Sequence, residues 1–251
     1  MVKIVLFSAS LFQVDERPVD FYVQGLRNWC DSIAANANDQ RFIYRFILYC
    51  QPHLLDKIAD IVTMYGGDGG GAYGFLAVET PPTALQDIMY GAMWRYLPHY
   101  YLATNDTTSK WADVDICISA DLDKLFINTV YNYSVIDWLL TNDNDSKRWM
   151  IQEPWWEHWF LPEVSGDFVM VKRGAALAAQ HTSVDEWMQT MIQFARDNID
   201  TVRQGRRSHR EFFYGLDEFF LTNYLWPLIR DHAETFVFIG APINGRKRCS
   251  K

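Results

Sequence analysis

Two carboxylates separated by one residue follow a short apolar run in the first half of the chain. Residues 114–119 have the composition of a buried strand, and Asp121 and Asp123 come directly after them. In an extended chain, residues i and i+2 point to the same side, so both carboxylates can approach one cation. Carboxylate oxygens suit Mg²⁺ or Mn²⁺, which complete their coordination with water and substrate phosphates. The pattern therefore indicates a divalent-metal site that serves a diphosphate.

The spacing alone is common in a chain this rich in aspartate. Composition predicts roughly two such triplets by chance, and the chain has three. The triplet at Asp113 precedes the strand and the triplet at Asp143 lies in a polar stretch, so position favours the pair at Asp121 as the metal site. The alternative is that Asp121 and Asp123 only cap the following turn.

The rest of the chain alternates short apolar runs with longer stretches of helical period. Runs rich in β-branched or aromatic residues predict strands over 3–9, 42–50, 75–79, 114–119, 167–172 and 236–239. Apolar residues three and four apart predict helices over 18–37, 51–65, 82–96, 129–140, 184–199 and 209–231. Ser183 and Glu186 form a possible capping box. The alternation predicts an α/β fold with a mixed, mainly parallel central sheet flanked by helices.

Composition and charge narrow the class of protein. A length of 251 residues predicts one domain with a substantial core. The net charge of -8 argues against a broad nucleic-acid surface. The cysteines lack the spacing of a zinc site or a disulfide framework, which fits reduced thiols. No apolar stretch reaches the roughly 18 residues of a membrane-spanning helix. We therefore expect a soluble, cytoplasmic protein with no transmembrane segment and no nucleic-acid partner.

Several motifs occur in order around the Asp121 pair. They are Trp94-Arg95-Tyr96-Leu97-Pro98, Ser119-Ala120-Asp121-Leu122-Asp123, a segment ending in Lys172-Arg173-Gly174, and Asp217-Glu218-Phe219-Phe220-Leu221 followed by Trp226-Pro227. With this order, over residues 22–231, the chain resembles the nucleotide-sugar-dependent glycosyltransferases of the GT-A fold. The resemblance implies a single GT-A-like, Rossmann-like domain over 1–251. Its nucleotide-binding part would cover about 1–125 and its acceptor part about 126–251.

The resemblance implies a metal site with named ligands. Asp121 and Asp123 correspond to the aspartates that hold Mn²⁺ or Mg²⁺ against the nucleotide diphosphate. His232, which follows the Trp-Pro pair, corresponds to a third metal ligand in some of these enzymes. The chain departs from many relatives at Ala120, where they carry arginine, so the donor cannot be transferred from them.

Residues near the donor are also implied by the resemblance. Arg95 and Asp121 would lie near the nucleotide-sugar donor. The residues that would border the nucleoside come at the end of the first strand and just after it: Ser8, Ala9, Ser10 and Leu11.

An inverting transfer needs a carboxylate to take the proton of the acceptor hydroxyl. Asp217 is the first candidate, through the motif it begins, and Glu153 and Asp167 follow it. The alternative for Asp217 is an ordinary acid on the surface of a helix.

Aromatic residues make up 16% of the chain, which is more than packing normally requires. Residues 152–160 concentrate them beside two carboxylates, with Trp155, Trp156 and Trp159 as the tryptophans. Rings stack on apolar sugar faces and carboxylates accept hydroxyl protons, which predicts a substrate-binding wall for a sugar. The alternative is an aromatic lid or a corner of the core.

These observations favour a metal-dependent glycosyltransferase that moves a sugar from a nucleoside diphosphate, UDP before GDP, to a hydroxyl of a glycan or glycoconjugate. One alternative is a non-catalytic sugar-binding module with a GT-A-like fold. A less favoured alternative is an Asp-x-Asp phosphatase with a nucleophilic aspartate, because Leu125 stands where such enzymes carry threonine or valine.

Overall fold

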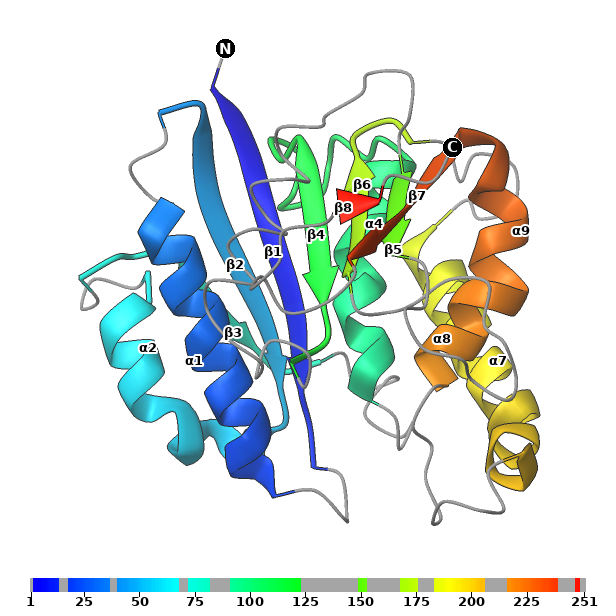
Figure 1. The fold of residues 1–251 in the computed structure, drawn as a ribbon, viewed down its shortest axis with the longest axis horizontal. Helices are drawn as coiled ribbons and strands as arrows, with labels where there is room; N and C mark the ends of the chain where they lie inside the picture. Colours follow the sequence, from blue (N-terminus) through cyan, green and yellow to red (C-terminus); the bar gives the residue numbers. More distant parts are fainter. Residues whose placement is uncertain are drawn as a thin grey trace.

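The fold is built on one sheet of eight described strands (Figure 1). In the computed structural model their order is β3-β2-β1-β4-β6-β5-β7-β8. The strands are β1 (Lys3–Leu11), β2 (Phe42–Cys50), β3 (Leu76–Glu79), β4 (Ile116–Ala120), β5 (Trp149–Gln152), β6 (Phe168–Lys172), β7 (Ala233–Phe238) and β8 (Lys247–Arg248). The structure describes residues 2–13, 18–36, 40–67, 72–81, 91–122, 149–152, 168–175, 183–205, 216–238 and 247–248.

The sheet is mixed and mainly parallel. β1 pairs in parallel with β2 and β4, β2 with β3, and β5 with β7. β6 runs antiparallel to its neighbours β4 and β5. The predicted α/β class, with a mixed, mainly parallel central sheet flanked by helices, is confirmed. The predicted strands are all present; β2 has the predicted bounds and the others have shifted ends. β5 and the two-residue β8 were missed, because such short runs show no clear alternation.

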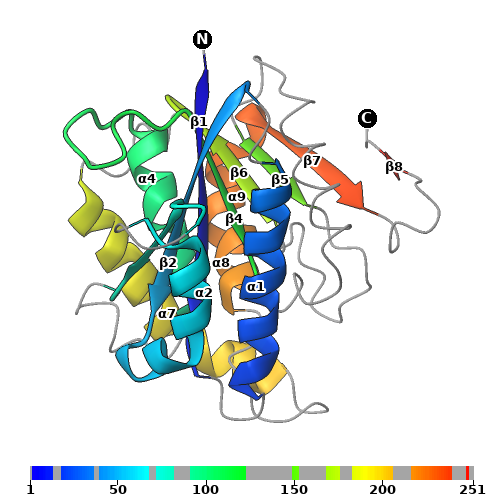
Figure 2. The same cartoon turned by 90° about the vertical axis from the view of Figure 1, so that its left-hand side faces the viewer.

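Helices cover both faces of the sheet. They are α1 (Val19–Asn36), α2 (Ala59–Tyr65), α4 (Leu97–Ala103), α7 (Val184–Gly205), α8 (Leu216–Phe220) and α9 (Trp226–Ile229), with 3₁₀ helices η1 (Pro52–Ile58), η2 (Gly91–Tyr96) and η4 (Arg230–His232) and a π turn η3 (Leu221–Leu225). Figure 2 shows α1 on one side of the sheet and α4 and α7 on the other.

The alternation of side chains along β1 divides the core into two layers. Val5 and Phe7 pack with α1, η1 and α2, whereas Leu6 packs with η2, α4, α7 and α8. Residues of even number in β1 therefore face the layer that holds η2 and α8. This parity decides which polar side chains of the strand can take part in a site there.

The predicted helices over 18–37 and 184–199 are confirmed as α1 and α7. The hydroxyl of Ser183 accepts a hydrogen bond from the backbone N–H of Glu186 at 3.2 Å, which is the forward half of the expected capping box. The predicted helix over 51–65 is present as η1 followed by α2. The predicted helix over 129–140 lies outside the described residues.

Two predicted helices differ from the structure at prolines. The predicted helix over 82–96 is described only from residue 91, as η2. The prediction ended this helix at residue 96, but α4 continues the helical path from η2 with Pro98 in its first turn, where proline is tolerated. The predicted helix over 209–231 is α8, η3, α9 and η4 over its described part. Pro227 lacks an N–H group and would collide with the carbonyl four residues before it. The π turn η3, which adds one residue to the helical turn, lies directly before this position.

Gly25 lets α1 approach the end of β4. A Cβ atom at Gly25 would lie 1.9 Å from the backbone oxygen of Leu122, the residue after Asp121. We expect Gly25→Ala to lower the free energy of unfolding by about 2 kcal/mol, because overpacking costs more than the gain in helix propensity. Urea unfolding measures this loss.

Gln24→Ala is the matched control, since Gln24 is exposed on the same helix. Because the shift would move the segment that carries Asp121, Gly25→Ala should also weaken Mn²⁺ binding. Unchanged stability and unchanged metal binding would show that α1 does not position this segment.

The Lys172-Arg173-Gly174 segment lies beside the amino end of β4. Arg173 Nε donates to the carbonyl of Val114 at 2.7 Å, and its Nη2 donates to the carbonyl of Trp111. Gly174 has a φ of 71° and donates its N–H to the carbonyl of Leu102. Lys172 pairs in register with Ile116, at the other end of β4 from Asp121. In this chain, the motif therefore holds strands and turns together.

The triplet at Asp113 is structural too. Asp113 binds both terminal nitrogens of Arg45, and Asp115 accepts the N–H of Ile4 at 2.8 Å. These contacts give the triplet at Asp113 a structural role, whereas Asp123 and the triplet at Asp143 lie outside the described residues.

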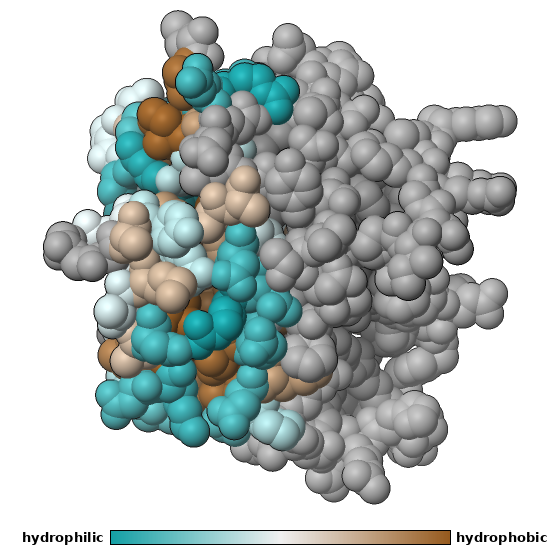
Figure 3. Space-filling view, turned by 60° about the vertical axis from the view of Figure 1, so that its left-hand side comes forward, coloured by the Kyte–Doolittle hydropathy of each residue, from teal (hydrophilic) through white to brown (hydrophobic). Residues whose placement is uncertain are grey.

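The surface described around η1, α2 and β3 is mixed. Figure 3 shows apolar residues scattered among hydrophilic ones on this side. The exposed large apolar side chains are Val2, Ile43, Leu55, Met64 and Tyr73. Single residues of this kind are normal on protein surfaces. Among the described helices, none combines the length and apolar character needed to cross a bilayer.

Candidate active site

The candidate site lies where the strand order changes direction. From β1 the chain moves to β2 and β3 on one side, and it then returns to β4 on the other side of β1. β1 and β4 are parallel neighbours, with Ser8 in register with Ser119. Ligands of open α/β sheets bind outside the carboxyl ends of strands at such a position. Asp121 directly follows the carboxyl end of β4.

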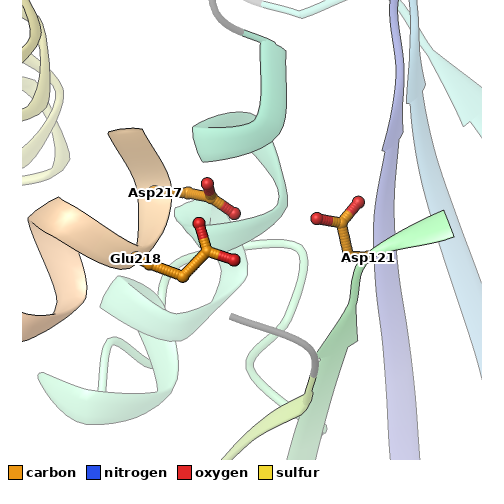
Figure 4. Close-up of side chains that lie close together, drawn as sticks. All are labelled: Asp121, Asp217 and Glu218. Carbon is orange, nitrogen blue, oxygen red and sulfur yellow. The ribbon is translucent and has the colours of Figure 1, made fainter. Parts of the chain in front are cut away.

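Three carboxylates meet at this position. Asp121, Asp217 and Glu218 each offer one ligand oxygen, and these oxygens all lie within 4.8 Å of one another. In Figure 4, Asp217 and Glu218 project from α8 toward Asp121 at the end of β4. Asp217 and Glu218 are buried and Asp121 is partly exposed.

Local sequence explains how these acids reach the site. In β4, Cys117 packs in the layer of η2 and α8, so by alternation Ser119 and Asp121 also point toward that layer. Asp217 and Glu218 occupy the first turn of α8, where the helix dipole favours negative charge.

Arg95 lies between the acids. Its Nη2 donates to Asp217 Oδ2 at 2.6 Å, and its Nη1 lies 3.3 Å from Asp121 Oδ1. Nη2 also lies 3.1 Å from the hydroxyl of Tyr96. Burial alone would lower the pKa of Arg95, but Tyr96, Asp121 and Asp217 raise it, so that it lies well above its usual value. Arg95 therefore brings a permanent positive charge into the core.

The residues present fit a hard divalent cation. Among these four described side chains, three carboxylates and one guanidinium sum to a charge of -2 when all are ionised. Oxygen ligands of this kind are those that Mg²⁺ and Mn²⁺ prefer. The acidic group (Asp121, Asp217 and Glu218) could therefore hold such an ion, with its remaining positions open to water and phosphate oxygens.

The four residues predicted to border a nucleoside divide between the two faces of β1. Ala9 and Leu11 pack in the layer of α1, so their side chains face away from the acidic group. Ser8 and Ser10 have the parity of Leu6 and face the acidic group's layer. Both serine hydroxyls are buried and have no hydrogen-bond partner among the described residues. Buried hydroxyls are normally paired, so these two are suited to meet a ligand or a water molecule.

His232 does not join the acidic group. It is exposed in η4, directly before β7. Ala233, the next residue, pairs with Trp149 of β5, which pairs with Val171 of β6, which in turn pairs with Cys117 of β4. His232 is therefore level with the amino end of β4. Asp121 lies beyond the opposite end of the same strand. The predicted third ligand is therefore wrong for this arrangement, because the antiparallel β6 sets the start of β7 level with the start of β4.

Several predicted site residues fall outside the described part of the chain: Asp123, Glu153, Asp167, Trp155, Trp156 and Trp159. Their metal, base and sugar-wall roles stay predictions.

Two features of the site were not predicted. Glu218 was not proposed as a site residue, although it adjoins Asp217 in the sequence. Arg95 was placed near a donor and not between Asp121 and Asp217. The sequence could have predicted the acidic partners of Arg95, because Arg95 lies within the otherwise apolar run 93–97. An arginine in a buried helix requires acidic partners.

His99 is a further buried group close to the site. It contacts the rings of Tyr96 and Trp149, and in the part of the chain that the structure describes neither of its ring nitrogens has a hydrogen-bond partner. Burial, with a smaller contribution from Arg95, lowers the pKa of His99 from 6.5 to about 3. The imidazole is therefore neutral at physiological pH.

We expect His99 to make the protein sensitive to mild acid. Between pH 6.5 and about 3, the unfolded chain binds a proton at this histidine and the folded chain does not. The free energy of unfolding should therefore fall as the pH falls, by up to about 1.4 kcal/mol per pH unit. Urea unfolding between pH 7 and pH 5 measures the slope. His99→Leu should flatten it, whereas His53→Leu, at an exposed position, should not; equal slopes in all three proteins would contradict this origin.

Comparison with solved structures finds likenesses at low identity. The chain aligns over 100% of its length with 82% of a cytidylyltransferase from Leptospira borgpetersenii, at 10% identity and a TM-score of 0.41. It aligns over 92% with 72% of the galactosyltransferase LgtC in complex with donor and acceptor sugar analogs, at 12% identity and a TM-score of 0.42. A 4-diphosphocytidyl-2C-methyl-D-erythritol synthase from Anaerococcus prevotii aligns over 91% of its own chain and 100% of this one, at 10% identity and a TM-score of 0.37. No protein-family model matches the chain, and no curated protein matches it.

Proposed function

We propose that this protein is a metal-dependent glycosyltransferase. It would move a sugar from a nucleoside-diphosphate sugar, with UDP favoured and GDP possible, to a hydroxyl of a glycan or glycoconjugate. The observation that carries the proposal is the acidic group at the carboxyl end of β4, beside the point where the strand order changes direction. That place suits a nucleotide, and those ligands suit the cation that accompanies a diphosphate.

Asp121, Asp217 and Glu218 would hold Mn²⁺ or Mg²⁺, with Asp123 as a further proposed ligand. When bound, the ion would supply positive charge that offsets the negative charge developing on the departing diphosphate. Arg95 would add a fixed positive charge beside the same oxygens, where its guanidinium contacts Asp121 and Asp217. Preorganised charge of this kind is effective in a water-poor site.

Ser8 and Ser10 would border the nucleoside. Their unpartnered hydroxyls lie on the face of β1 that carries the site. Ser10 is two residues beyond Ser8, as Asp121 is beyond Ser119, so the parallel register puts Ser10 level with Asp121. A nucleoside against β1 would thus have its diphosphate near the acidic group.

Asp217 is the proposed base whose position the structure describes. Its Oδ2 accepts a hydrogen bond from Arg95, so Oδ1 would take the proton of the acceptor hydroxyl if the reaction inverts. In that case Asp121, Glu218 and Asp123 would hold the ion without Asp217. Glu153 and Asp167 are retained as alternatives, and Trp155, Trp156 and Trp159 as the proposed sugar wall.

Calorimetric titration of UDP and GDP, with Mn²⁺ and with EDTA, tests the proposal. We expect nucleotide binding that requires the ion, followed by metal-dependent hydrolysis of one nucleotide sugar in a donor screen. Glycan binding without any nucleotide affinity would favour the sugar-binding module instead. Turnover of a simple phosphate ester, abolished by Asp121→Asn, would favour the phosphatase. Either of these results without metal-dependent nucleotide binding would overturn the transferase.

A further inference from the structure

Arg95 connects two parts of the fold that supply the acidic group. Asp121 follows a strand of the sheet, and Asp217 lies in the first turn of a helix in the second half of the chain. The same guanidinium contacts both carboxylates, at 3.3 Å and 2.6 Å. Arg95 is itself only 1% exposed. The ion pairs are therefore part of the core as well as part of the site.

The guanidinium has little freedom to leave this position. Trp94 and Tyr96, its neighbours in η2, are both buried in the same layer of the core. The Arg95 Cζ atom lies 5.1 Å from the centre of the Tyr96 ring, and Nη2 contacts the Tyr96 hydroxyl. Burial raises the pKa of Tyr96, so this phenol is neutral and cannot replace a carboxylate as partner.

The acidic group needs a positive charge in order to stay assembled. Its three carboxylates present oxygens within 4.8 Å of one another, and Asp217 and Glu218 are buried. Like charges at this separation repel, and burial removes the water that would screen them. Among the described residues, Arg95 supplies the positive charge that offsets this repulsion between the end of β4 and the first turn of α8.

We propose that Arg95 is a built-in counter-cation, which holds the acidic group together without a metal and shares its carboxylates with a divalent ion when one binds. It would thereby keep the site assembled in the metal-free protein and limit the affinity for the ion. Arg95 acts here as a positioning residue, through Asp121 and Asp217. The inference rests on the cation site of the proposed function and not on the transfer reaction.

Melting and metal binding of Arg95→Gln test the inference without any activity assay. We expect Arg95→Gln to melt well below the unaltered protein in EDTA, because the three carboxylates lose their counter-charge. Mn²⁺ should restore most of that loss, since the ion replaces the missing charge. The Kd for Mn²⁺ should fall about tenfold, because removing a positive charge a few ångströms away strengthens the attraction for the ion. A tighter site also gives a larger melting shift at equal Mn²⁺.

Two variants serve as controls. Arg95→Lys keeps the positive charge but loses the two separate nitrogens of the guanidinium. Its fall in melting temperature, and the recovery with Mn²⁺, should both be smaller than those of Arg95→Gln. Arg173→Gln removes a structural arginine at the other end of β4. Arg173→Gln should melt at a lower temperature than the unaltered protein. Mn²⁺ should raise its melting temperature only as much as it raises that of the unaltered protein.

The outcomes separate this inference from the proposed function. Mn²⁺ binding by the unaltered protein, with no recovery of Arg95→Gln, overturns the counter-cation role alone. If Arg95→Gln binds Mn²⁺ and the unaltered protein does not, the result would support the counter-cation role and overturn the metal dependence of the proposed transferase. If Arg95→Gln is unfolded in EDTA, refolding from urea replaces the melting curve. Cooperative refolding with Mn²⁺ supports the inference, and its absence overturns it when the unaltered protein binds the ion.

Discussion

Asp121→Asn should abolish metal-dependent nucleotide binding and lower kcat/KM for the sugar donor by about 10³-fold. The substitution removes a charged ligand from the acidic group and keeps the size of the side chain. Stability should change little, because Arg95 retains Asp217 at 2.6 Å. Titration of UDP with Mn²⁺ and initial rates of donor hydrolysis measure the two effects.

Asp113→Asn is the matched control for this substitution. Asp113 lies before β4, pairs with Arg45 at the surface and is about half exposed. Its variant should bind UDP and Mn²⁺ as the unaltered protein does. If both variants behave alike, or if Asp121→Asn still binds the nucleotide only with the ion, the acidic group is not the metal site.

Asp217→Ala should lower the free energy of unfolding by about 3 kcal/mol, because it removes the nearer of the two carboxylates that a buried guanidinium contacts. This guanidinium belongs to Arg95, which is buried in η2. Its remaining contact with Asp121 is longer, at 3.3 Å. Urea unfolding in EDTA at neutral pH measures the loss.

Asp113→Ala is the control, because it shows how much stability is lost when an exposed Arg–Asp ion pair is broken. It breaks the Arg45–Asp113 contact, which is well oriented but exposed, so the expected loss is below about 1 kcal/mol. Asp217→Asn, which keeps an oxygen acceptor for Arg95, should fall between the two alanine variants. Equal losses in Asp217→Ala and Asp113→Ala would show that the buried pair does not stabilise the fold.

Much of the architecture could be read from local pattern. β2 has the predicted bounds, and α1 and α7 occupy their predicted positions because apolar residues at helical spacing must face a core. Ser183 caps α7 because a serine hydroxyl satisfies a free N–H of the first turn. These features depend on contacts within a few residues, and such contacts are visible in the order of residue types.

The sequence by itself determined that Asp121 follows a buried strand, because a short apolar run ending in acids specifies its own local conformation. Only the tertiary structure decided which groups meet there. The packing of η2 and α8 in one layer of the core brings α8 to the end of β4, so Glu218 joins the site and Arg95 lies between Asp121 and Asp217. The reversed strand β6 takes His232 to the other end of the sheet. Contacts between distant residues depend on how strands pair across the whole sheet, and local sequence carries little of that information.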